Sequence, residues 1–440
     1  MRFQTTCDLL LLVALALCAL KPLEAQQQQQ QPDGQLERRP QHLFGGLIGS
    51  LTSPLRAIGQ QARGLLGRRA DSLGGFVQDN LELLQANAFK MFARVYNKTY
   101  SARELPKRMR LFFERRKEIE ESVRAFAAGQ LPFMMRENAY LDWDEQELRT
   151  LTGVSPPKSA AEWAAEQQAA GQQVALGGAK RFRRSLGQSG GDQDDELDPS
   201  ESLNLTVLAP RSIPAHKDWR LSGCVAAPVN QQKCGCCYAI ATVGVLESMR
   251  CLRQVSSPTL SAQQIVDCAT PRAGYQNFGC NGGWPTRALK YLQDKGVAAR
   301  DSCYPLVLRQ EVCKLNRVKQ VPGCTLAPSP AGGRLRYKVL TNERDILYHV
   351  ANTGPVITVM RATDRFLYYG SGIFDDPKCS RRSSDVDHAI AIVGYGRENG
   401  QDYWLIKNSW GAGWGQQGYG KYRRGTNACS IGHWAWVILD

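Results

Sequence analysis

One cysteine stands where its surroundings favour the reactive thiolate. Cys237 lies within residues 230–240, and the stretch that follows carries apolar Ile240, Val243 and Leu246 at near-helical spacing. The positive end of a helix dipole favours a nearby negative charge, so a thiol at the start of a helix ionises more readily. Because the thiolate is the nucleophilic form of cysteine, this position predicts a covalent nucleophile.

Three residues elsewhere could complete nucleophilic chemistry around this thiol. Gln231, six residues upstream, could donate its amide to an oxyanion, and His388, in the run Asp387-His388-Ala389, could act as a base. Asn408 could orient the imidazole through a hydrogen bond. Taken singly, Cys237 could be a disulfide partner, His388 a core residue and Asn408 a turn cap. Their joint occurrence favours catalysis.

The spacing of the histidine and the asparagine gives a geometric prediction. Residues 396–400 form a turn signal between two runs of strand type, and a hairpin symmetric about Glu398 places His388 directly opposite Asn408. Directly opposed residues share a face of the sheet, with Cβ atoms about 4.5–5.5 Å apart. A slip of one residue would place the two side chains on opposite faces.

The chain after residue 212 changes from helical to strand periodicity. Helical spacing dominates to about residue 300, whereas runs of strand type lie beyond residue 335, at 356–359, 388–393, 403–407 and 419–423. We therefore expect two subdomains, one helical and one β-rich, with the site in the cleft between them.

Three motifs in this region resemble those of the papain family of cysteine peptidases, on its cathepsin L-like side. They run from Gln231 to Ile240, over 386–389 with 393–396, and from Lys407 to Gly415. In this order they cover roughly residues 212–440. The resemblance implies an α+β fold of two lobes, one helical and one β-barrel-like, with a cleft between them and a small α-helical propeptide domain in front.

The same resemblance implies a cysteine-type endopeptidase that is made as an inactive zymogen and needs no cofactor or metal. His388 would take the proton of Cys237, and the Gln231 side chain with the Cys237 N–H would stabilise the oxyanion. Trp410 would shield the Asn408–His388 bond from solvent. The sequence has no obvious cleft-blocking insertion, which favours endopeptidase over exopeptidase action.

A substrate wall and a main specificity pocket are also implied. The backbone of Gly283 would pair with an extended substrate, as in strand addition. Trp434 maps to the pocket floor, where its indole could either make the pocket shallow or simply pack in the core. The implied substrate-binding residues are Gly282, Gly283, Trp284, Pro285, Val359, Val386, Asp387, Ala389, Trp410 and Trp434.

The chain departs from the family pattern beside the nucleophile. Cys236 replaces a serine, Tyr238 a tryptophan and Gln232 a glycine. The glutamine could narrow the approach to the thiol or alter the loop. The paired cysteines suggest the hypothesis that oxidation to a Cys236–Cys237 disulfide switches the enzyme off.

Residues 87–150 resemble the family's inhibitory propeptide. Glu104, Arg108, Phe112 and Ile119 share one helix face, and residues 138–142 match the second propeptide motif. Glu104 and Arg108 can pair as helix neighbours. The departures from the propeptide pattern are Arg115, Val123 and Arg136.

Cysteine usage predicts a disulfide framework in one domain. All of the 14 cysteines except Cys7 and Cys18 lie after residue 223, and such clustering is typical of an exported protein. The family resemblance implies the pairs Cys234–Cys280, Cys268–Cys313 and Cys379–Cys429. The pairs Cys224–Cys251 and Cys303–Cys324 are plausible additions, but the sequence leaves their connectivity open.

The remaining segments indicate export and processing. Residues 1–25 have the pattern of a signal peptide, with a signal anchor as the alternative, and residues 26–86 are of low complexity. Residues 151–211 are expected to form a flexible linker before the peptidase domain at 212–440. Within this linker, residues 181–184 are either a proprotein-convertase site or a solvated basic run. The pattern indicates a location in the secretory pathway, in the lysosome or in the extracellular space.

Two asparagines, Asn97 and Asn204, match the glycosylation pattern. The net charge of +14 comes largely from the first half of the chain, so a solvated surface is favoured over binding to acidic glycans or membranes. No nucleic-acid motif occurs, and no stretch after the leader is long and apolar enough to span a membrane.

Two other classes of protein remain as alternatives. One is a catalytically silent papain-like binding protein. The other is a zinc site built from Cys234, Cys236, Cys237 and a histidine, although these lack regular ligand spacing. We expect a monomer that acts on protein or peptide substrates and is inhibited by its own propeptide.

Overall fold

The structure is a computed structural model that describes residues 83–157, 213–253, 259–327 and 334–439, together with positions 159, 162, 164 and 329. Residues from Gln85 onward belong to one folded unit. The predicted leader, residues 181–184 and Asn204 lie outside the described residues, as do most of the low-complexity segment and of the linker. Within the described part, no helix combines the length and the hydropathy that crossing a membrane requires.

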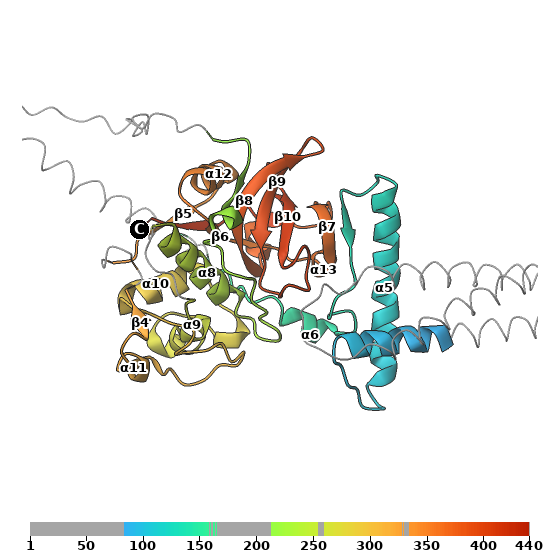
Figure 1. Cartoon of the computed structure of the whole chain (residues 1–440), viewed down its shortest axis with the longest axis horizontal. Helices are drawn as coiled ribbons and strands as arrows, with labels where there is room; N and C mark the ends of the chain where they lie inside the picture. The colour runs from blue at the N-terminus through green and yellow to red at the C-terminus, as the bar shows by residue number, and fades with distance from the viewer. Residues whose placement is uncertain are drawn as a thin grey trace, which may run out of the picture. The chain divides into compact units, whose positions relative to one another are not determined.

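The helical lobe is built around α8 (Cys237–Leu252). Nearly all of α8 is buried, because it packs against α9 (Ala262–Cys268) and α10 (Pro285–Lys295) and also against β8 (His388–Glu398) of the other lobe (Figure 1). Ser261 caps α9 by accepting a hydrogen bond from the Gln264 N–H, and Pro285 opens α10. The lobe also contains α11 (Leu315–Val318), β3 (Ala298–Ala299) and β4 (Thr325–Leu326).

A nine-stranded sheet forms the core of the second lobe. Its other strands are β1 (Phe133–Met135), β2 (Lys217–Asp218), β5 (Tyr337–Leu340), β6 (Val356–Met360), β7 (Tyr369–Phe374), β9 (Gln401–Lys407), β10 (Tyr419–Arg423) and β11 (Ala435–Ile438). The order is β1-β7-β10-β9-β8-β6-β11-β5, and β2 pairs with β8. The strand runs expected beyond residue 335 correspond to β6, β8, β9 and β10.

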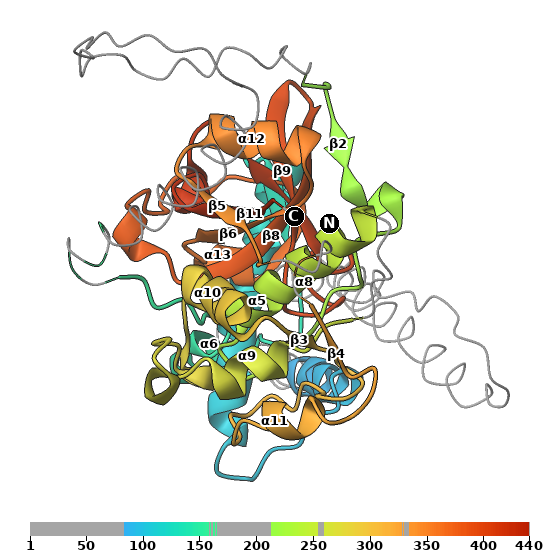
Figure 2. The same ribbon diagram turned by 90° about the vertical axis from the view of Figure 1, so that its left-hand side faces the viewer.

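Two helices accompany the sheet, and they explain why β8 is apolar on both faces. α12 (Glu343–Asn352) packs over β8 and β6, while α8 of the helical lobe also contacts β8 (Figure 2). α13 (Asp364–Leu367) packs beside β7. The mixed architecture confirms the expected α+β class with one helical and one β-rich lobe. Short 3-10 turns lie at Trp219–Ser222, Pro271–Ala273, Gly279–Asn281, Ser383–Asp385 and Ala428–Ser430.

The hairpin of β8 and β9 turns later in the chain than predicted. Its loop consists of Asn399 and Gly400, whose φ angles are 50° and 77°. Two consecutive residues with positive φ are typical of a tight two-residue hairpin turn, for which Asn-Gly is a favoured sequence. Glu398 consequently pairs with Gln401, and the predicted symmetry about Glu398 is wrong.

A bulge between residues 392 and 394 shifts the ladder again, so that its last pair is Ala391 with Lys407. His388 therefore does not lie directly opposite Asn408, which follows the end of β9. If the ladder continued in this register, Asn408 would face a residue two positions along from His388. Residues two apart in a strand lie on the same face, so this residue and His388 share one face of β8. Such diagonal neighbours still lie within reach of a long side chain.

The segment before the linker packs on the sheet lobe, and it contains α5 (Leu105–Ala127), α6 (Glu145–Arg149) and a helical stretch at residues 83–95 (Figure 1). β1 extends the sheet by pairing antiparallel with β7. Phe112 of α5 contacts Phe89 and Phe92, with ring centroids 5.4 and 4.7 Å apart. Arg108 binds Glu147 of α6 more closely than its helix neighbour Glu104.

The three departures from the propeptide pattern have different surroundings. Arg115 donates hydrogen bonds to the carbonyls of Tyr140 and Leu141, at 3.2 and 2.8 Å. Arg136 donates to the Gly415 carbonyl of the sheet lobe at 2.6 Å. Val123 is 41% exposed on α5. Both arginines therefore make contacts that hold this segment together or against the sheet lobe.

Substitution Phe112→Ala should loosen this domain. The ring is buried within the aromatic cluster, so its removal should lower the free energy of unfolding by about 3–5 kcal/mol. Thermal unfolding of the full chain measures the change. The control is Val123→Ala on the exposed face of the same helix, which should shift the midpoint little. Equal shifts for the two variants would contradict the packing described here.

Candidate functional site

Cys237 is the first residue of α8, directly after the N-cap residue Cys236. Its side chain is fully buried at the junction of the helical lobe with β8. Burial raises the pKa of the Cys237 thiol to about 12, because a thiolate loses its hydration there. The backbone N–H groups of Ala389, Gly153 and Tyr238 act in the opposite direction but are outweighed.

The sequence argument predicted a thiolate favoured by the helix dipole, and in this covered state that prediction is wrong. The reason is that desolvation of the buried thiol outweighs the effect of the helix dipole. The thiol is therefore protonated at neutral pH in this structure, although it retains its position at the N-terminus of α8.

The imidazole of His388 lies at the start of β8 and contacts Asn408 despite the changed register. Its Nε2 is 2.8 Å from Asn408 Oδ1, and both side chains are buried. Burial lowers the pKa of His388 to about 4, with the asparagine acting in the opposite direction. The ring is therefore neutral at neutral pH, and the bond to Oδ1 places its proton on Nε2.

The indole of Trp410 covers the imidazole. The two rings stack with centroids 4.6 Å apart and an angle of 28° between their planes. Phe366 and Trp414 pack in turn against Trp410, at 5.4 and 5.7 Å. Asn408 is only 2% exposed behind this aromatic layer. The hydrogen bond between Asn408 and His388 is thus kept from water.

The Gln231 side chain makes four hydrogen bonds, one of them a long contact of 3.5 Å from Nε2 to the Thr150 carbonyl. Its Nε2 donates to the carbonyl of Cys234 at 3.0 Å and to that of Leu151 at 3.1 Å. Its Oε1 accepts from the Ser409 hydroxyl at 2.6 Å. Leu151 is the first residue of the expected linker, yet it is buried here, so the expected boundary at residue 151 is too early. Its carbonyl contacts the amide predicted to bind an oxyanion.

Residues 151–155 form hydrogen bonds with both lobes. Ser155 N–H donates to the carbonyl of Gly283, and Gly283 N–H donates to the carbonyl of Gly153, both at 2.9 Å. On the other side, the N–H groups of Gly153 and Val154 donate to the Asp387 carbonyl at 3.0 and 2.9 Å. The predicted substrate wall at Gly283 is thus already paired with an extended strand.

Gly153 owes its identity to the closeness of the two backbones. A Cβ atom added to it would lie 2.0 Å from the carbonyl oxygen of Gly235. No side chain can be accommodated at that distance. The glycine therefore allows the segment to lie directly on the loop that precedes the thiol.

The residues predicted to form the specificity pocket do gather in one apolar cluster. Trp284, Val359, Val386, Ala389 and Trp434 are all buried there, and Val154 packs against this cluster. The Trp284 and Trp434 rings meet edge to face with centroids 6.4 Å apart. A Cβ on Gly282 would lie 2.8 Å from Ser155 Oγ, and Pro285 begins α10 directly behind the wall.

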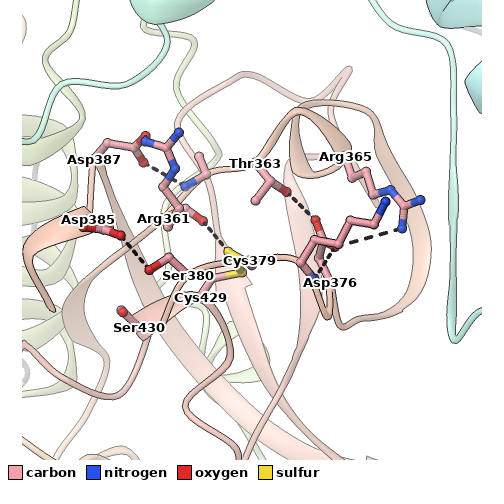
Figure 3. Close-up of a disulfide and its surroundings, with 12 residues drawn as sticks. Arg361, Thr363, Arg365, Asp376, Cys379, Ser380, Asp385, Asp387, Cys429 and Ser430 are labelled. Atoms are coloured by element: carbon pink, nitrogen blue, oxygen red, sulfur yellow. Dashed lines mark hydrogen bonds and ion pairs between the residues drawn. A yellow bond between two sulfur atoms is a disulfide. The ribbon is translucent and has the colours of Figure 1, made fainter. Parts of the chain in front are cut away.

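Asp387 has a structural role that its sequence motif did not reveal. Its carboxylate forms an ion pair with Arg361 and accepts a hydrogen bond from the Ala362 N–H at 2.8 Å (Figure 3). Burial raises its pKa to about 6, while Ala362 and Arg361 act in the opposite direction. The carboxylate is therefore turned toward Arg361, and its backbone carbonyl binds residues 153 and 154.

The departures beside the nucleophile are accommodated locally. Gln232 adopts a φ of 46°, a region that favours the glycine it replaces, and its side chain is exposed. The Tyr238 hydroxyl donates to the Gly279 carbonyl at 3.2 Å, and its ring lies against Gly283. Cys236 and Cys237 are both free thiols, so the hypothetical vicinal disulfide is not present here.

Five disulfides occur among the described residues. Three are the pairs that the family resemblance implied, and the other two are Cys224–Cys251 and Cys303–Cys324. Cys379–Cys429 lies beside Arg361 and Asp387 (Figure 3). The alternative zinc site is wrong, because Cys234 is bonded to Cys280 and is no longer a thiolate ligand. Nowhere in the described part do three or more potential metal ligands converge.

Two contributors to the site escaped the sequence argument. Ser409 binds the Gln231 amide, and its position between Asn408 and Trp410 in the third motif was the available signal. Arg361 binds Asp387, but 26 positions separate them and no local pattern connects them.

Comparison with known proteins confirms the family resemblance. Residues 213–438 match the family model for papain family cysteine protease. The chain is 35% identical over 246 residues to cysteine proteinase 3 of Solanum lycopersicum. The aligned region covers 55% of this chain and 64% of that protein. It is 39% identical over 235 residues to digestive cysteine proteinase 1 of Homarus americanus. Here the aligned region covers 53% of this chain and 69% of that protein.

A solved proform resembles both lobes and the preceding segment. The structure of digestive procathepsin L2 proteinase from Tenebrio molitor larval midgut superposes with a TM-score of 0.61 at 28% identity. The match covers 81% of this chain and 100% of that one. This extent confirms that the helical domain around α5 corresponds to the propeptide of a proform.

Acid should destabilise the covered state through His388. Its pKa is about 4 when buried and about 6.5 in an unfolded chain, so the unfolded state alone binds the proton between these values. Stability is therefore fully present above pH 6.5 and falls by up to about 3 kcal/mol as the pH drops to 4. Thermal unfolding of the full-length Cys237→Ala chain measures this from pH 8 to 4.

The matched control adds His388→Gln, which cannot titrate. Asp387 and other carboxylates contribute equally to both chains, so the difference between the two pH profiles isolates the imidazole. Parallel profiles would show that His388 does not carry this pH dependence.

Proposed function

Because the chain belongs to the papain family of cysteine proteases, we propose that it is a cysteine-type endopeptidase made as an inactive zymogen. The observation that carries the proposal is the 2.8 Å bond from His388 Nε2 to Asn408 Oδ1, beside a free thiol at the N-terminus of α8. These features support a site in which one lobe contributes the nucleophile and the other contributes the base and its orienting amide.

Catalysis begins when residues 151–155 leave. Cys237 and His388 regain contact with water, the desolvation cost falls, and the proton passes from sulfur to the imidazole with help from the helix dipole. The thiolate attacks a peptide carbonyl carbon, while Gln231 Nε2 and the Cys237 N–H bind the developing oxyanion. His388 then protonates the leaving amine, and water, deprotonated by the same imidazole, hydrolyses the thioester.

The inhibitory segment occupies the donor that the oxyanion would need. Gly153 donates its backbone N–H to the Asp387 carbonyl at 3.0 Å, which holds the segment across the site. The carbonyl of Leu151 meanwhile takes the amide of Gln231 and the indole N–H of Trp410. The segment therefore engages the oxyanion donor while it covers the site.

We propose that substrate specificity depends on Trp434. Backbone hydrogen bonds of Val154 and its neighbours hold this stretch against both lobes. The Val154 side chain packs against the cluster that contains Trp284 and Trp434. A substrate paired with Gly283 would place one side chain where Val154 now lies. The two buried indoles restrict the depth of this position, so small aliphatic side chains should bind better than aromatic ones.

The disulfides indicate the compartment in which the protein folds. Five disulfides suit an oxidising environment, and we assign the enzyme to the secretory pathway, acting in the lysosome or outside the cell. Asn97, one of the glycosylation acceptors, is exposed on the propeptide.

Substitution Cys237→Ala should abolish peptide hydrolysis. The loss in kcat should reach at least about 10⁴-fold, as expected when a covalent nucleophile is removed. The measurement uses processed enzyme and an internally quenched peptide, with Cys236→Ser as the neighbouring control that keeps the nucleophile. Labelling with an epoxide-type thiol inhibitor should occur in the control and fail in the Ala variant. An unlabelled wild-type Cys237 would favour the silent binding protein instead.

Substitution Trp434→Ala should widen the specificity pocket. The wild-type enzyme should cleave substrates with Val at the pocket position faster than those with Phe. The variant should raise kcat/KM for Phe by roughly tenfold or more relative to Val. Trp436→Phe, in the same cluster but bonded to Thr286, should keep the wild-type preference. A wild-type preference for Phe would refute the shallow pocket.

A further inference from the structure

Lys233 lies in the loop before the nucleophile, and the propeptide engages it through a carboxylate. Its Nζ is 2.8 Å from Glu147 Oε1 of α6. Its ammonium group also lies 5.2 Å from the centroid of the Trp143 ring, which is again part of the propeptide. Among the described residues, Glu147 is the one carboxylate that forms an ion pair with Lys233. Both partners therefore leave with the propeptide, and the cation stays beside the site.

The group that Lys233 binds in the zymogen is an ionised carboxylate. Burial acts to raise the pKa of Glu147, but hydrogen bonds from Arg108 and Lys233 outweigh it and lower the pKa to about 2. Arg108 belongs to α5 and departs together with Glu147. Of the two cations that bind this carboxylate, only Lys233 remains on the peptidase domain after activation.

The inhibitory segment passes the site in a definite order. From α6, whose Glu147 binds Lys233, the chain continues to Leu151, whose carbonyl accepts from Gln231 Nε2 at 3.1 Å. Further along, the segment pairs with Gly283 through backbone hydrogen bonds of 2.9 Å. Lys233 therefore contacts the part of the segment that precedes the oxyanion donor, whereas Gly283 contacts the part that follows it.

A substrate that occupies the same path has its acyl part along Gly283 and its scissile carbonyl at Gln231. The part that is released as the amine then extends toward the place of α6, beside Lys233. We propose that Lys233 is a specificity residue that binds a carboxylate on the leaving-group side of the substrate. The carboxylate belongs either to an acidic side chain or to the C-terminus of the substrate. This inference rests on the proposed function and adds a charge preference to it.

Exposure determines the size of the expected effect. The Lys233 side chain is 58% exposed, so water and dissolved ions weaken its attraction for a carboxylate. An exposed ion pair of this kind corresponds to a roughly two- to fivefold preference in kcat/KM. Because the attraction is screened by salt, the preference should shrink as the ionic strength rises, whereas recognition by shape would persist.

The test uses processed enzyme and internally quenched peptides that differ at one position after the scissile bond. Glu, Gln and Lys stand in turn at the second, third or fourth such position, and each peptide ends in an amide. At one of these positions the wild-type enzyme should cleave the Glu peptide roughly two- to fivefold faster in kcat/KM than the Gln peptide, and the Lys peptide should be slowest. A second set carries Gln throughout and a free C-terminal carboxylate. The set that shows the preference identifies the source of the carboxylate.

Charge reversal at this residue gives the sharpest comparison. Lys233→Glu should invert the order, so that a Lys peptide is cleaved faster than its Glu counterpart, while kcat/KM for the Gln peptide stays within about twofold. Lys233→Gln should remove the preference in both directions. The matched control is Lys290→Glu on α10, a lysine that is 57% exposed and pairs with Asp294 at 2.8 Å, and it should keep the wild-type order.

The outcomes separate this inference from the proposed function. Wild-type enzyme that neither hydrolyses peptides nor is labelled at Cys237 by an epoxide-type thiol inhibitor would refute the proposed function itself. Active enzyme with equal rates on the Glu, Gln and Lys peptides, and none gained from a free C-terminus, would overturn only the role of Lys233. So would a preference for Glu that persists in Lys233→Glu, or an order that Lys290→Glu inverts equally, since the preference would then not arise from Lys233.

Discussion

Two ionisable side chains, one thiol and one imidazole, are buried together at the junction of two lobes, and this burial governs the chemical state of the molecule. Desolvation raises the pKa of Cys237 and lowers that of His388, so both are neutral while residues 151–155 cover them. The helix dipole and the Asn408 hydrogen bond favour the charged forms but are outweighed. In the mechanism that we propose, removal of the cover changes the charge state of the site without any new covalent bond.

Residues 151–155 can lie this deep because their backbone groups form hydrogen bonds with both lobes. Gly153 and Val154 bind the Asp387 carbonyl, while residues 153 and 155 pair with Gly283. These bonds replace those that the walls would otherwise make with water or substrate. The rest of the propeptide is held at a distance from the thiol, by β1 on the sheet edge and by the arginines at 108, 115 and 136. Departures from the family pattern at positions 115 and 136 thus contribute contacts of their own.

Local patterns predicted much of this arrangement. The three motifs identified the family, the change from helical to strand periodicity identified the two lobes, and the helical spacing of residues on one face of α5 identified the side that packs. Contact between His388 and Asn408 was also anticipated, although by an incorrect register. The Asn-Gly turn and the bulge at residues 392–394 moved the pairing, and the contact survived because the two residues remain diagonal neighbours on one face.

The sequence by itself determined the identities and order of the reactive groups, because motif spacing along a helix start or a strand depends only on local geometry. Tertiary structure alone decided their protonation, since desolvation arises from burial between elements that are far apart in the chain, as when Trp410 stacks on His388. It also decided the partners of Gln231 and Asp387. Ser409 and Arg361 reach these side chains only through sheet pairing and loop packing, which no single-chain periodicity encodes.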